Sequence, residues 1–133
     1  MASYQKSVNI CAGAQTVWDA VSDVGQLHIR IAPGLVTDTR LDDGGAIRIV
    51  TFANGLSLKE HIVSNDNDLQ RLVWSAESDL WHHHNASLQV FARGNDACEI
   101  TWIADVLPHE AGETISTIMD MGLAAMKKHI ESQ

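Results

Sequence analysis

Near its C-terminus the chain reads EAGETISTIMDMGLAAMKKHI (residues 110–130), its one long segment with the apolar spacing of a helix. Apolar or small residues recur every three or four positions and form one stripe: Ile115, Ile118, Met119, Gly122, Ala125, Met126 and the pair His129–Ile130. Acidic residues stand at its start and basic residues near its end, which suits the helix dipole. Because the stripe is narrow and its side chains are small or flexible, we expect a sheet to grip this helix and to leave space beside it.

The composition fits one globular domain, residues 1–133, and argues against a polyanionic partner. The 133 residues are 45% apolar and 20% charged, which is ordinary for a folded domain. A net charge of −8, with nine scattered Lys and Arg residues, argues against nucleic acid and against a membrane surface. No apolar run reaches the roughly 18 residues of a membrane span, and a signal-peptide pattern is absent. We therefore expect a cytoplasmic protein whose two cysteines, Cys11 and Cys98, are reduced and buried.

Before the long helix, the pattern predicts one strand, two short helices and six more strands. The first strand covers residues 4–10, a helical face covers 14–24, and a short second turn covers 26–32. The β-like runs that follow are bounded by turns rich in Gly, Asn and Asp: 35–41, 46–52, 56–64, 72–77, 82–93 and 97–107. The short links make neighbouring strands antiparallel, so we predict an α+β fold.

Strand alternation carries two opposite charges toward the interior. Alternate residues of a strand share a face, which places Arg48 and Glu60 on the apolar faces of the third and fourth strands. The turn between these strands decides whether the two side chains meet. A two-residue turn at 54–55 sets Glu60 opposite Ile49, whereas a three-residue connection over 54–56 puts Arg48 and Glu60 on one side. The sequence leaves both registers open.

The histidine run at residues 82–84 is the one compositional oddity. Alternation points His82 and His84 inward and the middle imidazole outward. A metal site would need a third ligand such as His61, His28 or Glu60, and two ligands alone do not complete one. We expect neither a metal nor another cofactor, and we expect His84 to serve as a hydrogen-bonding histidine.

Together these features resemble a known superfamily. The motifs are, in chain order, Ala14-x-x-Val17-Trp18, Arg48-x-Val50, Asn54-Gly55 followed by Glu60, HNASLQV (84–90), Thr101-Trp102 and GLAAMK (122–127). They resemble the START/Bet v 1-like (SRPBCC) superfamily, and within it the small bacterial polyketide cyclase/dehydrase-like branch. The resemblance implies a helix-grip fold: a curved seven-stranded antiparallel sheet wraps the C-terminal helix, two short helices follow strand one, and the whole encloses an apolar cavity.

The resemblance also implies a ligand. Members bind lipids, sterols, polyketides or plant hormones, and some catalyse cyclisation, dehydration or condensation, so the fold alone does not set the function. We expect a monomer or homodimer that binds a small hydrophobic or aromatic molecule, with Trp81 exposed at the cavity mouth. The expected lining is Val50, Phe52, Leu58, Ile62, Trp74, Ala76, His82, Leu88, Trp102, Ile118, Met119, Gly122 and Met126.

The alternative is an enzyme of the cyclase/dehydratase type. Its candidate catalytic residues are Glu60 or His84, which would remove a proton next to a carbonyl, and Arg48, which would stabilise the enolate. The related plant abscisic acid receptors carry an Arg and a Glu at positions matching Arg48 and Glu60, which favours the three-residue turn. They have a Tyr where His84 aligns and a Lys on the second strand that this chain lacks, so the same ligand is not implied. A structural ion pair, and a ligand-gated interaction module using residues 53–57, are the other hypotheses.

Overall fold

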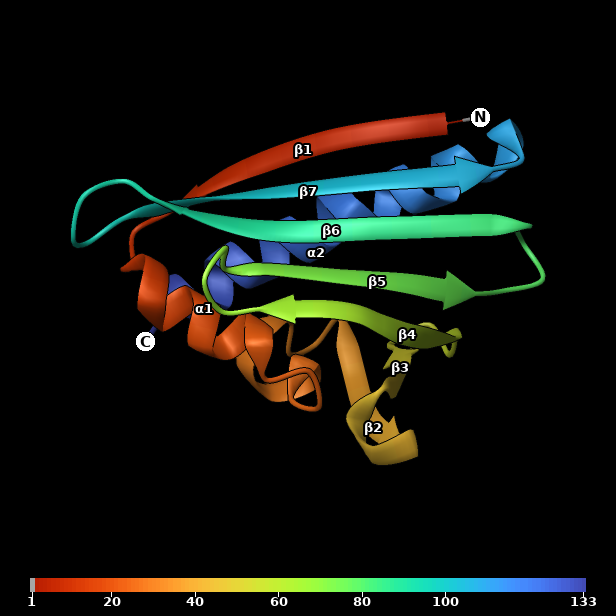
Figure 1. The fold of residues 1–133 in the computed structure, drawn as a ribbon, viewed down its shortest axis with the longest axis horizontal. Helices are drawn as coiled ribbons and strands as arrows, with labels where there is room; N and C mark the ends of the chain where they lie inside the picture. Colours follow the sequence, from red (N-terminus) through yellow and green to blue (C-terminus); the bar gives the residue numbers. More distant parts are fainter. Residues whose placement is uncertain (1) are drawn as a thin grey trace.

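A seven-stranded antiparallel sheet frames the protein in the computed structural model, which describes residues 2–133 (Figure 1). Its strands are β1 (Ala2–Ile10), β2 (Val36–Asp42), β3 (Ile47–Phe52), β4 (Ser57–Asp66), β5 (Arg71–Glu77), β6 (His83–Ala92) and β7 (Cys98–Leu107). Their spatial order is β1-β7-β6-β5-β4-β3-β2. Consecutive strands thus pair from β2 to β7, and β1 joins the edge beside β7. The predicted fold class is confirmed.

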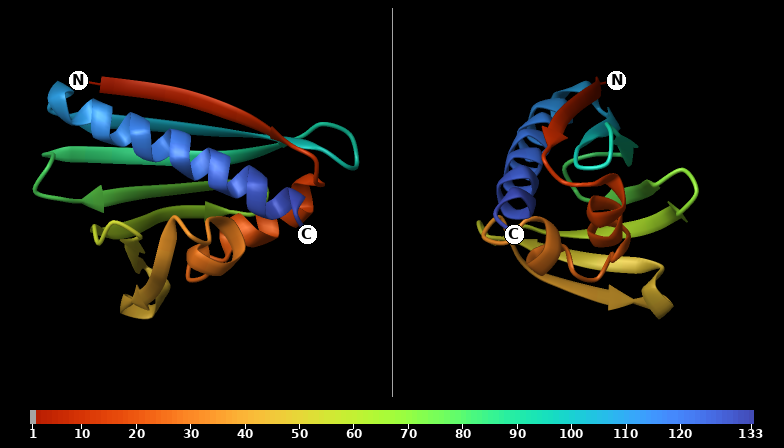
Figure 2. Two further views of the ribbon diagram at one scale, coloured as in Figure 1. Left: turned by 180° about the vertical axis from the view of Figure 1, so that it is seen from behind. Right: turned by 90° about the vertical axis from the view of Figure 1, so that its left-hand side faces the viewer.

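Three helical segments cover the concave side of this sheet. They are α1 (Ala14–Ser22), the single π-helical turn η1 (Leu27–Ile31) and the long α2 (Gly112–Glu131); the 3-10 turns η2 (Asp43–Gly45) and η3 (His109–Ala111) are connections. Figure 2 shows the sheet curling around α2, which runs obliquely across it and ends near α1. This is the helix-grip arrangement that the resemblance implied.

The inner face of α2 follows most of the predicted stripe, although Ile118, Ala125 and His129 are only partly buried and Leu123 is buried in addition. The residues that it buries are Gly112, Ile115, Met119, Gly122, Leu123, Met126 and Ile130. At Gly122 the helix approaches β7 so closely that a Cβ atom would stand 2.8 Å from Trp102 Cζ3. Lys6 links β1 to α2, because its Nζ donates to Ser116 Oγ and Asp120 Oδ1, both at 2.7 Å. The helix is therefore held tightly at the β1–β7 side of the sheet.

The connection between β3 and β4 is a three-residue loop, 53–55. It is closed by the Phe52 N–H, which donates to Leu56 O at 2.8 Å, and Gly55 adopts a φ of +90°. Arg48 then lies directly opposite Glu60 in the ladder. The two-residue register is therefore wrong, and the three-residue length is right but begins one position earlier than 54–56, because Phe52 is the last paired residue.

The two cysteines differ in burial. Cys98 lies on β7 opposite Ile10, and burial raises the pKa of its thiol. Cys11 is exposed, so the expectation that both cysteines are buried is wrong for Cys11; both thiols are free. Among residues 2–133, no helix is both long and apolar enough to cross a membrane.

Candidate functional site

A largely apolar cavity lies between the concave face of the sheet and α2. It offers about 80 Å³ of space to the centres of water molecules. Several predicted lining residues border it: Phe52, Leu58, Trp74, Ala76, Leu88, Trp102, Ile118, Gly122 and Met126. The three candidate catalytic residues, Arg48, Glu60 and His84, border it as well. Alternation along the strands and the helical stripe were thus enough to find most of the sheet and helix walls.

Four predicted lining residues lie elsewhere. Val50 and Met119 are on the expected faces, but neighbouring side chains enclose them completely. Ile62 is half-buried next to a register shift between β4 and β5, and it does not reach the cavity. His82 is exposed because β6 begins only at His83, so the strand alternation on which its inward direction was based does not extend to it.

The sequence-based prediction missed the end of the cavity that faces α1 and η1. The lining residues that it did not include are Val21, Leu27, Ile31, Ala32, Leu35, Val36, Leu72 and Ile115. Val21 and Ile115 carried a signal, since each lies on the apolar face of a predicted helix. The segment from η1 to the start of β2 carried none, because its position depends on how the chain folds back over the sheet rather than on any periodicity.

Arg48 and Glu60 form a buried ion pair in the cavity wall. Their side chains project from paired positions on β3 and β4, and Arg48 Nε donates to Glu60 Oε1 at 2.7 Å. The residues are 4% and 6% exposed. The guanidinium carbon of Arg48 also lies 5.5 Å from the centre of the Trp74 ring, within cation–π distance. Each charge thus has a partner, which a buried charge requires.

His84 is held by two contacts on the sheet. The Ala76 N–H on β5 donates to His84 Nδ1 at 3.0 Å. The Trp81 ring lies beside the imidazole, with centroids 5.5 Å apart, and its Nε1–H donates to Ala76 O at 2.8 Å. Trp81 is therefore buried, and the prediction of an exposed residue at the mouth is wrong because its indole N–H finds a backbone acceptor inside.

Burial lowers the pKa of His84 to about 4, because desolvation disfavours the imidazolium; the neighbouring His83 lowers it further and Asp105 opposes the shift. His84 is consequently neutral near pH 7. Trp102 adds a further polar group to the wall, since its Nε1–H is buried without a partner. Its ring packs against Trp74 with centroids 5.7 Å apart.

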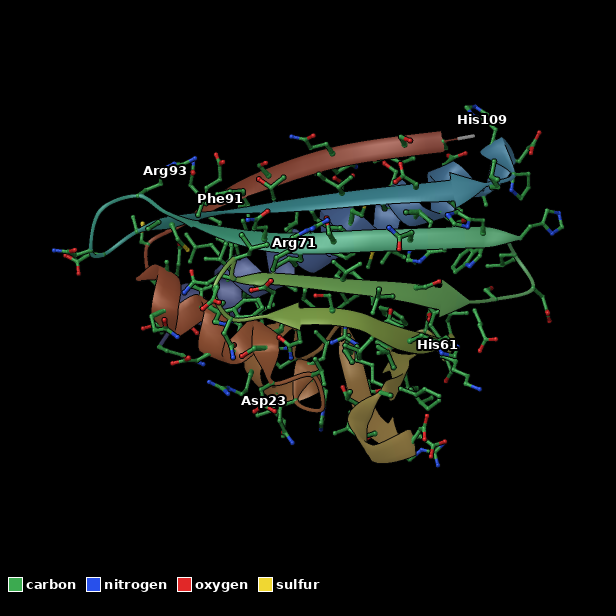
Figure 3. All side chains as sticks on the ribbon, viewed as in Figure 1. Asp23, His61, Arg71, Phe91, Arg93 and His109 are labelled. Atoms are coloured by element: carbon green, nitrogen blue, oxygen red, sulfur yellow. The ribbon has the colours of Figure 1, made fainter. Side chains whose placement is uncertain are left out.

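The outer face of the sheet is separate from this site. His61 on β4, labelled in Figure 3, contacts Glu77 on β5, with 3.0 Å between Nε2 and Oε2. It thus lies on the opposite face of β4 from Glu60, as alternation predicts. Within residues 2–133, no group of three or more His, Cys, Asp or Glu side chains is arranged to hold a metal ion.

The fold occurs in several solved structures. An uncharacterised protein from Bacillus thuringiensis superposes with a TM-score of 0.87 over 99% of this chain and 100% of its own, at 16% identity. The di-domain ARO/CYC BexL of the BE-7585A biosynthetic pathway gives 0.84 over 98% of this chain and 47% of BexL, at 14% identity. Norcoclaurine synthase from Thalictrum flavum gives 0.73 over 98% and 91%, at 23% identity. These likenesses show the shared fold.

The sequence itself identifies the family. No curated protein matches the chain. A family model described as polyketide cyclase/dehydrase and lipid transport matches residues 1–131, nearly the whole length. The chain therefore belongs to the polyketide cyclase/dehydrase and lipid transport family.

Proposed function

We propose that the protein binds a small hydrophobic or aromatic molecule between the sheet and α2. The observation that carries this proposal is the cavity itself: apolar walls with a buried Arg48–Glu60 pair and a buried His84 on the sheet side. Ligand sites typically combine such apolar walls with a few placed polar groups that orient the ligand. The family description, which names both polyketide chemistry and lipid transport, points to the same kind of molecule.

The size of the cavity limits the ligand. A dry cavity of about 150 Å³ is enough for benzene, and the space here is about 80 Å³. A bound ring must therefore push part of the wall outward. Five lining residues are only partly buried, and movement of the wall costs least there: Leu27, Leu35, Phe52, Trp102 and Ile118.

Two structural neighbours support an aromatic ligand by analogy of fold. BexL is an ARO/CYC of a biosynthetic pathway, and norcoclaurine synthase has been solved with dopamine and hydroxybenzaldehyde. Their sequence identities to this chain, 14% and 23%, are too low to transfer a substrate. They do show that aromatic compounds are handled by proteins with this fold.

The cavity proposal is tested by a substitution that fills the cavity. Calorimetric titration with acetophenone and acetonaphthone should give saturable one-to-one binding. Ile118→Trp should weaken it by at least about tenfold, because Ile118 lines the cavity and the larger ring fills part of it. Met121→Trp is the matched control, since Met121 is 50% exposed on the same helix and does not border the cavity. No saturable binding to the wild-type protein, or equal loss in both variants, would contradict the proposal.

An enzyme of the cyclase/dehydratase type is the second candidate, and the placement of Glu60 favours it. A carboxylate in an apolar cavity wall can take a proton from a carbon next to a carbonyl, and Arg48 can stabilise the charge that develops on the oxygen. The test is deuterium exchange into the methyl group of acetonaphthone in heavy water. Exchange above the buffer rate that is lost in Glu60→Gln would support it, and wild-type exchange at the buffer rate would contradict it.

A further inference from the structure

His84 has a fixed proton position, which defines what it can offer a ligand. Its Nδ1 accepts a hydrogen bond from the Ala76 backbone N–H. A backbone amide can only donate, so Nδ1 must present its lone pair. A neutral imidazole carries one proton, and that proton must then be on Nε2. His84 is thus a hydrogen-bond donor at Nε2 and has no free lone pair.

This Nε2–H belongs to a residue that lines the cavity. His84 is 6% exposed and lines the cavity. Among residues 2–133, none bonds to its Nε2, and no contact joins it to the Glu60 carboxylate. The side-chain atoms in this part of the chain that are both unpaired and closed to water are His28 Nδ1 and Trp102 Nε1. His84 Nε2 is not among them, so it meets space that water can enter, and the cavity is the space that His84 lines.

The other polar groups of the wall also favour an acceptor on the ligand. Glu60 is the one carboxylate among the lining residues, and its Oε1 already accepts a hydrogen bond from Arg48 Nε. An unpaired buried donor is unfavourable, and a ligand that accepts its hydrogen bond recovers the lost free energy. The cavity therefore selects for an acceptor oxygen.

We propose that the ligand carries a carbonyl oxygen that accepts a hydrogen bond from His84 Nε2–H, and that His84 acts as a neutral donor rather than as a base. This inference rests on the proposed binding function and narrows it to aromatic or polycyclic carbonyl compounds. It also divides the roles in the enzyme alternative. His84 polarises the carbonyl, and Glu60 is the group left to accept a proton.

The proton position is tested without any ligand. Long-range ¹H–¹⁵N NMR of the histidine side chains, assigned by comparison with His84→Asn, distinguishes the two nitrogens of the ring. The expected spectrum at neutral pH shows a neutral His84 protonated at Nε2. A ring protonated at Nδ1, or an imidazolium, would overturn the inference.

The ligand class is tested with isosteric pairs. Acetophenone is compared with α-methylstyrene, and acetonaphthone with isopropenylnaphthalene, so that each pair differs by a carbonyl oxygen in place of a CH₂ group. The wild-type protein should bind each ketone about tenfold more tightly than its hydrocarbon partner. Equal binding within each pair would overturn the inference and leave the proposed function standing. Binding of none of the four compounds would overturn both.

Two substitutions locate the effect at His84. Asn can replace Nδ1 as the acceptor for the Ala76 N–H but does not reach the cavity, whereas Gln can place an amide N–H where Nε2 stands. In His84→Asn the affinities for a ketone and for its hydrocarbon partner should differ by no more than about twofold. In His84→Gln the preference for the ketone should return. A preference that His84→Asn leaves intact would overturn the assignment to this residue.

Discussion

Arg48 and Glu60 are two buried residues whose charges depend on each other. Removing one partner of a buried pair leaves an uncompensated charge, which typically costs 3–5 kcal/mol. Arg48→Met should therefore lower the free energy of unfolding by about 3–5 kcal/mol, measured by urea denaturation. The cost arises from the charge left on Glu60 more than from any lost packing.

The double variant Arg48→Met/Glu60→Leu separates these two causes. With both charges gone, apolar side chains of similar size face the same apolar surroundings, and most of the lost stability should return. A double variant as unstable as the sum of the two single variants would contradict a coupled pair. Unchanged stability in Arg48→Met would show that the pair is solvated rather than buried.

His84 makes stability depend on pH. Its pKa is about 4 in the folded protein, against an ordinary value of 6.5. As the pH falls below 6.5, the imidazole of His84 binds a proton in the unfolded chain but stays neutral in the folded protein. The free energy of unfolding therefore decreases from about pH 6.5 down to about pH 4. Between about pH 8 and about pH 5 the loss should be about 2 kcal/mol.

Carboxylates also titrate in acid, so the comparison with His84→Asn isolates this contribution. The difference in unfolding free energy between the wild-type protein and the variant should shrink by about 2 kcal/mol over the same interval. A difference that is constant with pH would show that His84 titrates normally in the folded state.

At the scale of elements, α2 contains two glycines that pack against different parts of the sheet. A Cβ at Gly122 would meet the Trp102 ring at 2.8 Å, and a Cβ at Gly112 would meet Ala2 Cβ at 2.6 Å. Gly122→Ala should push Trp102 into the cavity and weaken acetonaphthone binding by at least about tenfold, with little loss of stability, because helix propensity gains about 1 kcal/mol. Circular dichroism and calorimetry measure both quantities.

Gly112→Ala is the control for this effect. The new methyl group crowds β1 and lies outside the cavity lining, so it should cost about 1–3 kcal/mol of stability and leave the affinity unchanged. The account is contradicted if Gly122→Ala binds as well as the wild type, or if Gly112→Ala loses affinity to the same extent.

The elements themselves were largely predictable, and the reason is local. Strand runs end at turns such as Asp42–Gly45 and Gly94–Asp96, whose residues favour turns on their own, so most strand bounds agree within one or two positions. The face of α2 follows from spacing alone. Both predictions depend on neighbours in the chain.

Other features depend on contacts between distant segments. The loop at 53–55 begins one position earlier than the expected one because the pairing of β3 with β4 stops at Phe52 and does not include residue 53. His82 is exposed because β6 starts one residue later than its apolar pattern indicated. The lining from η1 is set by where that turn packs against α2 and β2, and no local pattern encodes this.

For the whole molecule, the geometry of the fold leaves the cavity. A curved sheet touches α2 most closely at β1 and β7 and diverges from it toward β3 and β4, and η1 closes much of the remaining gap (Figure 2). Filling that gap with apolar side chains alone would give a plain core. Instead, the sheet side carries Arg48, Glu60 and His84, whose burial is costly unless their polar groups are used. The ligand is therefore expected to meet these three residues.

The most direct test of this account is a ¹H–¹⁵N NMR titration of the whole protein with acetonaphthone. Saturable shifts are expected for the Ala76 amide, which is bonded to His84, and for the Trp102 indole N–H, because both residues line the cavity. Amides of Arg71 and Phe91 on the outer face of the sheet, labelled in Figure 3, should not move. Shifts confined to that outer face, or none at saturating ketone, would contradict the claim that the cavity is the binding site.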